Sequence, residues 1–137
     1  MKYFLSLTIV FLMSCNSTSK AINATKFPSG KYQVVSLHID TYKPQKDYTL
    51  SVNSETNSIG GTFDCNTFSV DYEINEDTLK FGYAIATKMY CEDNMHNENA
   101  FFQATQSISS YVYNKGRLTF YNDLKDVVLE LKFLENE

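Results

Sequence analysis

Three cysteines, Cys15, Cys65 and Cys91, are the residues of this chain whose chemistry says most about it. Cys15 follows an apolar run at the start of the chain, where a thiol is a candidate for acylation. If Cys15 carries lipid, Cys65 and Cys91 remain as an even pair in an exported protein, where thiols tend to oxidise. We therefore predict a disulfide between Cys65 and Cys91.

A metal site is the alternative use of this pair, with His96 and Asp93 as further ligands. Zinc sites usually contain close-paired ligands, such as two cysteines separated by two residues, and the sequence has no such pair. The prediction is therefore no metal and no cofactor, and metal binding remains the alternative to the disulfide.

Candidates for catalysis are few. A nucleophile needs a base and an orienting group within reach, and the two histidines lie at a predicted strand end (His38) and in a polar loop (His96). Asp71 and Glu73 could serve acid–base chemistry, but solvated charge is the commoner role for such residues near a turn. We expect that the protein is not an enzyme, and we assign no catalytic residue.

The first 14 residues are typical of a lipoprotein signal peptide. Lys2 is followed by the apolar run FLSLTIVFLM at residues 4–13, which is shorter than the 20 or so residues that span a membrane. Leu12-Met13-Ser14-Cys15 resembles a lipobox, so we predict cleavage before Cys15 and a membrane anchor on its thiol. Asn16 is not acidic and gives no signal for the inner membrane, which favours the outer membrane.

The charge and length of the mature chain restrict its possible partners and its number of domains. Without Lys2 it keeps 11 of the 12 basic residues against 16 acidic ones, a net charge of −5 with no basic stripe. We therefore expect no nucleic-acid partner, because phosphate binding depends on clustered Lys and Arg. We expect a flexible polar tether at 15–29 and one monomeric domain at 30–134.

Alternating apolar residues predict an antiparallel sheet. The expected strands cover 31–39, 48–52, 59–66, 68–74, 78–81, 117–121 and 127–133. Gly60 and Gly61 lie inside one of them and predict a bulge or a close approach of a neighbouring backbone.

A helical period appears between residues 93 and 112. Phe101, Thr105, Ile108 and Val112 recur at the spacing of one helix face, which we expect to pack on the sheet. Asn97 is the predicted N-cap, and Glu98 is placed favourably in the first turn.

Two short motifs occupy the middle of the chain: GGTFDCNTF at 60–68 and, one strand later, ATKMYC at 86–91, ahead of the helix. Their order and spacing resemble the G-x-x-x-C-N and T-x-M-x-C elements of the META domain of HslJ-like bacterial lipoproteins, over residues 30–133. The chain departs from that family at Asp64 and Val70, where glycines are usual, and at Tyr32, where tryptophan is common.

The resemblance implies an α+β, mostly β fold: a bent antiparallel sheet, partly barrel-like, with one packed helix. Its motif residues here are Gly61, Asn66, Thr87 and Met89. Asn66 would cap a turn, Thr87 would bond neighbouring backbone, and Met89 would fill a gap in the core. Family members are mostly described as heat-inducible or drug-tolerance-associated envelope proteins without an established reaction, and some relatives are linked to secretion or assembly.

These features together predict a non-catalytic envelope lipoprotein with a stress-related or assembly-supporting role, which binds a protein partner or an apolar ligand. A ligand within the curved sheet would need a cavity or groove lined by Tyr and Phe. The alternative is an inhibitor-like module that inserts a protruding loop, 41–47 or 93–97, into the cleft of another protein.

Overall fold

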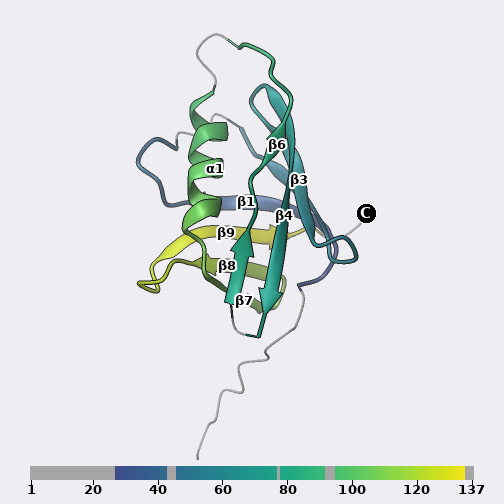
Figure 1. The fold of residues 1–137 in the computed structure, drawn as a ribbon, viewed down its shortest axis with the longest axis vertical. Helices are drawn as coiled ribbons and strands as arrows, with labels where there is room; N and C mark the ends of the chain where they lie inside the picture. Colours follow the sequence, from purple (N-terminus) through teal and green to yellow (C-terminus); the bar gives the residue numbers. More distant parts are fainter. Residues whose placement is uncertain (1–26, 43–45, 77, 92–94, 135–137) are drawn as a thin grey trace, which may run out of the picture.

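The computed structural model describes residues 27–42, 46–76, 78–91 and 95–134, which form an antiparallel sheet and one helix (Figure 1). Cys15, the predicted signal peptide and most of the predicted tether lie outside these ranges, as does Asp93. The strands are β1 (Gly30–Leu37), β2 (Thr49–Asn53), β3 (Ser58–Phe63), β4 (Asn66–Asn75), β5 (Thr78–Phe81), β6 (Ile85–Ala86), β7 (Ser110–Asn114), β8 (Arg117–Tyr121) and β9 (Val127–Phe133), and helix α1 spans His96–Ser107.

The strands follow one another in the order β5-β4-β3-β2-β1-β9-β8-β7, and β6 pairs with β4 alongside β5. The two ends of this order meet where the backbone N–H of Leu79 donates to the carbonyl of Ser109 at 2.9 Å. The sheet is therefore nearly closed into a barrel with a seam. This confirms the prediction of a mostly β, bent and partly barrel-like sheet with one helix.

Alternation along the strands gives the sheet its buried face. In β4, Phe68, Val70 and Tyr72 point inward, whereas Asp71 and Glu73 are exposed. The largest fully buried rings come from widely separated parts of the chain: Phe27, Tyr32, Tyr48, Phe63, Phe101 and Phe120. The interior of the barrel is filled by the protein's own side chains.

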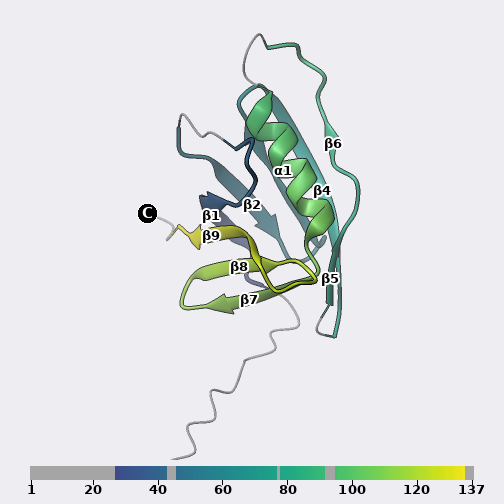
Figure 2. The same cartoon turned by 90° about the vertical axis from the view of Figure 1, so that its left-hand side faces the viewer.

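Helix α1 covers the open side of the barrel, between β1 and β9 on one side and β4 and β5 on the other (Figure 2). The ring of Phe101 packs at 4.9 Å from those of Phe63 and Phe68. Within the described ranges no helix combines the length and apolar character needed to cross a membrane.

The predicted end of the helix is wrong. The helix stops at Ser107, and Val112 lies half-exposed in β7, opposite Thr119 of β8. Lys115 and Gly116 both have positive φ in the tight turn that joins these strands. Residues 110–114 therefore belong to a hairpin, because cross-strand pairing outweighs a helical spacing that continued only by coincidence.

The domain also begins earlier than predicted. Phe27, which the tether prediction included, is fully buried, with its ring 4.7 Å from Tyr72 and 5.0 Å from Tyr111. Just after it, the hydroxyl of Tyr32 donates to the carbonyl of Pro28 at 2.8 Å. A residue that contributes a buried ring to the core cannot be part of a flexible tether.

Candidate functional site

The segment 82–91, which leads from β5 past β6 toward the helix, is the part of the fold that brings the two sequence motifs together. Its backbone is held to β4 at three levels. Gly82 N–H donates to Asp71 O at 2.8 Å, Ile85 and Ala86 form the short β6 ladder, and Thr87 N–H donates to Thr67 O at 3.0 Å. The segment thus lies along an edge of the sheet.

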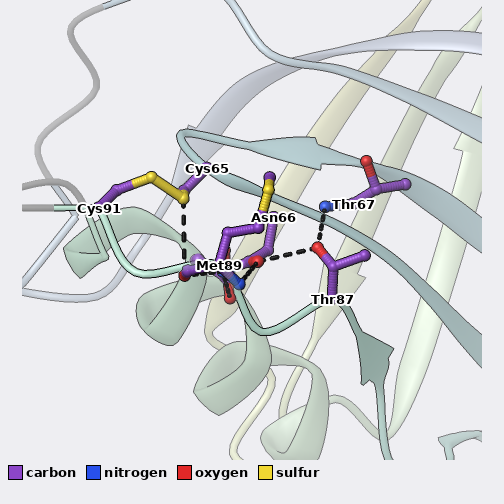
Figure 3. Close-up of a disulfide and its surroundings, with 7 residues drawn as sticks. Cys65, Asn66, Thr67, Thr87, Met89 and Cys91 are labelled. Carbon is purple, nitrogen blue, oxygen red and sulfur yellow. Dashed lines mark hydrogen bonds between the residues drawn. A yellow bond between two sulfur atoms is a disulfide. The ribbon is translucent and has the colours of Figure 1, made fainter.

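Asn66, the first residue of β4, holds the far end of this segment (Figure 3). Its Oδ1 accepts from Met89 N–H and from the Thr87 hydroxyl, both at 2.8 Å. Its Nδ2 donates to Met89 O at 3.3 Å and to Glu98 Oε1 at 3.2 Å. Asn66 is almost fully buried. Its hydrogen bonds link β4 to the segment 82–91 and to helix α1. The prediction that Asn66 caps a turn is therefore wrong.

Of the other motif residues, Thr87 has the role predicted for it and Met89 does not. The Thr87 hydroxyl accepts from the backbone N–H of Thr67 at 3.2 Å, as expected of a side chain that bonds neighbouring backbone. The Met89 side chain does not fill the core, because it is 57% exposed. Met89 contributes through its backbone instead, because its N–H and its carbonyl both bond Asn66.

Gly61 permits a close approach between strands. A Cβ on Gly61 would lie 2.8 Å from Leu50 Cδ2 and 3.1 Å from Thr49 O. The pairing of β3 with β2 and β4 is continuous at this position. The prediction of close backbone approach is therefore confirmed, and the alternative of a bulge is not.

A disulfide joins Cys65 to Cys91 beside this cluster, with the two Cα atoms 6.0 Å apart. It lies one residue before Asn66 and two residues after Met89, so it closes the same junction covalently. Both sulfur atoms are bonded to each other and are not available as metal ligands. His96, from the metal alternative, is the exposed first residue of α1 rather than part of a loop.

Glu98 brings a buried carboxylate to the cluster from the first turn of α1, where the helix dipole favours negative charge. Oε1 accepts from Asn66, and Oε2 has no hydrogen-bond partner among the described residues. Glu98 was predicted in this first turn, but its contact with Asn66 was not. Sequence position alone does not reveal that the helix start faces the motif.

A second cluster of polar side chains, which the sequence did not reveal, is centred on the hydroxyl of Tyr48. This hydroxyl donates to Asp64 Oδ1 and accepts from Asn97 Nδ2 at 3.0 Å. Burial, and next the hydrogen bond to Asp64, raise the pKa of Tyr48 to about 12. Asn97 is therefore not the N-cap, a position that Met95 occupies without a side-chain hydrogen bond.

Asp64 explains one departure from the family pattern. Its φ is +43°, in the left-handed region that glycine adopts readily and that Asp tolerates better than most residues. The chain therefore keeps the backbone conformation that a glycine would supply. It also gains a carboxylate that accepts from Tyr48.

Four large side chains of the segment 82–91 point away from the domain. Tyr83 is 89% exposed, Ile85 79%, Met89 57% and Tyr90 83%. We call these four residues the apolar row. Between them, Ala84 and Ala86 are partly buried against the core, so the segment turns its small side chains inward and its large ones outward.

The remaining candidates do not converge. His38 is exposed, and its ring nitrogen lies 3.2 Å from the hydroxyl of Ser36. Asp71 and Glu73 line an open hollow together with Lys80 and Tyr83. Among the described residues, no group of three or more His, Cys, Asp or Glu side chains is placed to hold a metal ion.

The aromatic residues expected to line a ligand cavity pack against one another instead. The ring of Phe63 lies 4.5 Å from that of Tyr48 and 4.9 Å from that of Phe101. A binding function is therefore better sought on the surface than within the curved sheet.

The META domain model matches residues 25–133 of the chain. Among curated proteins, none matches the sequence significantly. An NMR structure of a protein from Burkholderia xenovorans is similar over 79% of this chain and 83% of its own, with 15% identity and a TM-score of 0.58. The crystal structure of a DUF4847 family protein from Bacteroides vulgatus is similar over 80% and 95%, with 13% identity and a TM-score of 0.55. At such identities these structures show the fold alone.

Proposed function

Because the chain belongs to the META domain family, we propose that it is a non-catalytic lipoprotein of the cell envelope that acts as a binding module. In this proposal residues 1–14 are a signal peptide, and Cys15 carries the lipid that holds the protein at the outer membrane. The role of the domain is stress-related or assembly-supporting. It binds another envelope component through its surface.

The observation that carries this proposal is the apolar row. Of the seven large hydrophobic side chains that are exposed among the described residues, four lie within the segment 82–91, at positions 83, 85, 89 and 90. Exposed apolar side chains that gather in this way often mark a binding surface. The segment is fixed by three hydrogen bonds of Asn66, to Thr87 and Met89, and by the disulfide. The buried polar cluster thus acts as a support that presents the row.

The chemistry of the buried groups favours binding over catalysis. Cys65 and Cys91 have no free thiol while they form the disulfide. A Tyr48 phenol with a pKa of about 12 stays protonated at neutral pH and is a poor base. Asn66 has all of its amide groups engaged within the protein. Each of these four residues therefore has a structural role, which supports a binding module.

Intact mass spectrometry of the protein purified from membranes tests the anchor. We expect a chain that begins at Cys15 and carries diacylglyceryl-type lipid, with two further thiols that react only after reduction. The variant Cys15→Ser is the control, and it should lose both the lipid mass and the membrane retention. A mass without lipid on the wild-type protein would contradict the anchor.

Hydroxyl-radical footprinting tests the binding module. Tyr83 and Tyr90 should be oxidised less in intact envelopes than in the purified protein, because a bound component covers them. Leu124, which is 81% exposed on the turn between β8 and β9, is the control and should react equally in both samples. Equal oxidation of Tyr83 and Tyr90 in both samples would show that the apolar row is not a binding surface.

A further inference from the structure

We infer that the apolar row docks on the lipid bilayer itself, so that the domain lies against the membrane with the segment 82–91 at the interface. This inference rests on the proposed lipidation of Cys15, and it names the component that the row binds. The lipid on Cys15 and the apolar row would then be two separate contacts with the same membrane.

The composition of the row is that of a membrane interface. Tyr83 and Tyr90 stand at the two ends, and Ile85 and Met89 lie between them. Tyrosine prefers the boundary between lipid and water, where the ring is apolar and the hydroxyl reaches the headgroups. Ile85 and Met89 supply the apolar surface that enters the region below.

Charge on the segment is compatible with the same surface. Lys88 is the one charged residue among positions 82–91, and its side chain is exposed. A lysine beside apolar residues can bury its methylene stem while its ammonium group stays with the headgroups. Positions 82–91 contain no carboxylate. The exposed Asp71 and Glu73 line a hollow together with Tyr83, and they would have to stay on the water side of the docked row. The mature chain, without Lys2, is acidic with a net charge of −5, so apolar contact rather than charge would drive docking.

The length of the preceding chain places the bilayer within reach. Phe27, the first buried residue, comes 12 residues after Cys15. A fully extended chain spans at most 3.3–3.6 Å per residue, so the domain stays within about 40 Å of the lipidated cysteine. A short linker of this kind gives an effective concentration in the millimolar range. The row would then be bound most of the time if its dissociation constant for lipid lies below this effective concentration.

The shape of the region also favours lipid over a protein partner. The segment that contains β6 runs along the outer side of the molecule, beyond β4 and α1 (Figure 2). Protein partners concentrate binding energy in well-packed pockets. A fluid bilayer, by contrast, accepts protruding aromatic side chains without a complementary shape.

The absence of tryptophan from the sequence permits a direct test. The variant Tyr90→Trp introduces a single reporter in the row. Val35→Trp is the matched control, because Val35 is a half-exposed apolar residue of β1, which β2 and β3 separate from β4. Both lipidated proteins are placed in phosphatidylcholine vesicles whose acyl chains carry bromine, a contact quencher of tryptophan emission.

We expect the emission of Tyr90→Trp to shift to shorter wavelength and to lose about half of its intensity, as for an aromatic residue at the interface. The emission of Val35→Trp should stay unchanged. Adding Ile85→Asp to the Tyr90→Trp protein should restore the emission, because a carboxylate in the row opposes docking.

Two results would overturn the inference while leaving the lipoprotein assignment intact. In the first, the protein remains on the vesicles but Tyr90→Trp behaves like Val35→Trp. In the second, Tyr90→Trp is shielded in native envelope membranes and not in lipid vesicles, which would make a protein the partner. Loss of the wild-type protein from the vesicles would instead contradict the proposed anchor as well.

Discussion

The side-chain amide of Asn66 bonds both backbone polar groups of Met89, its N–H and its carbonyl. Met89 N–H donates to Asn66 Oδ1 at 2.8 Å, and Asn66 Nδ2 donates to Met89 O at 3.3 Å. An asparagine side chain carries the same donor and acceptor as a peptide bond. Asn66 therefore acts as an extra rung of the sheet where the ladder between β4 and the segment 82–91 ends.

Replacing Asn66 with Ala removes this rung and two further hydrogen bonds, from Thr87 and to Glu98. At roughly 0.5–1.5 kcal/mol for each bond, and with the Glu98 carboxylate left buried, we expect a loss of about 3 kcal/mol in the free energy of unfolding. Urea denaturation followed by circular dichroism measures it.

Asn53→Ala is the matched control for Asn66→Ala. The Asn53 side chain also accepts from two backbone N–H groups, those of Glu55 and Thr56, but in an exposed turn. Water can replace these bonds, so the loss should be no more than about 1 kcal/mol. Equal losses in the two variants would show that the buried cluster has no special role.

The disulfide should contribute strongly to stability under oxidising conditions. Cys65 and Cys91 are separated by 26 residues, and closing such a loop in the unfolded chain is worth about 3.5 kcal/mol in the chain-entropy model. We expect the double variant Cys65→Ser/Cys91→Ser to unfold at lower urea concentration. Its midpoint should not respond to a reductant, whereas that of the wild-type protein should fall. A wild-type midpoint that is insensitive to reductant would contradict this prediction.

Much of the sheet could be predicted because burial is regular along it. In β4, each inward residue alternates with an outward one, and that period of two is visible in the sequence. The helix end could not be predicted in this way, because Val112 continues the helical spacing by coincidence and pairs with Thr119 in a hairpin. Local spacing does not reveal which distant strand competes for the same residues.

The candidate site was predicted in its parts but not in its connections. The disulfide follows from counting cysteines, and Thr87 has the expected contact with backbone. Met89 was assigned to the core from its residue type, yet its side chain is exposed, and its backbone N–H and carbonyl make the contacts with Asn66. Contacts of Tyr48 with Asp64 and Asn97 join residues up to 49 positions apart, a distance across which spacing gives no signal.

The glycines of the fold provide a paired test of packing. Gly61→Ala would place a methyl group 2.8 Å from Leu50 Cδ2, so β2 and β3 would have to move apart. We expect a loss of about 1–3 kcal/mol, as for other overpacked sites. Gly82→Ala is the control, because its methyl group would meet only Asp71 O at 3.6 Å. Thermal unfolding of both variants checks the difference, and equal melting temperatures would contradict the close approach at Gly61.

Asp64 can be tested against the glycine that the family usually has at its position. Asp64→Gly relieves the strain of a positive φ but removes the hydrogen bond from Tyr48. A hydrogen bond to a charged group contributes about 1.5–3 kcal/mol, which exceeds the relief, so we expect net destabilisation of about 1 kcal/mol. Asp64→Asn retains an acceptor and should fall between the two in urea denaturation. A more stable Asp64→Gly protein would show that strain dominates at this residue.

The buried Tyr48 predicts a loss of stability at alkaline pH. Its pKa is raised from 10.0 to about 12, first by burial and next by the hydrogen bond to Asp64. Between these values the unfolded chain releases the phenolic proton and the folded protein keeps it, so the free energy of unfolding falls as pH rises. The stabilisation is fully present below pH 10. Tyr42 and Tyr72, each with a pKa of about 12, act in the same direction.

Tyr48→Phe isolates the share of this one phenol. The variant should be less stable than the wild-type protein at pH 7, because Asn97 and Asp64 lose their common partner. Its stability should then fall less steeply between pH 10 and pH 12. Urea denaturation at a series of pH values measures both effects. An unchanged slope in Tyr48→Phe would contradict this prediction. It would mean that the Tyr48 phenol ionises equally easily in the folded and unfolded states.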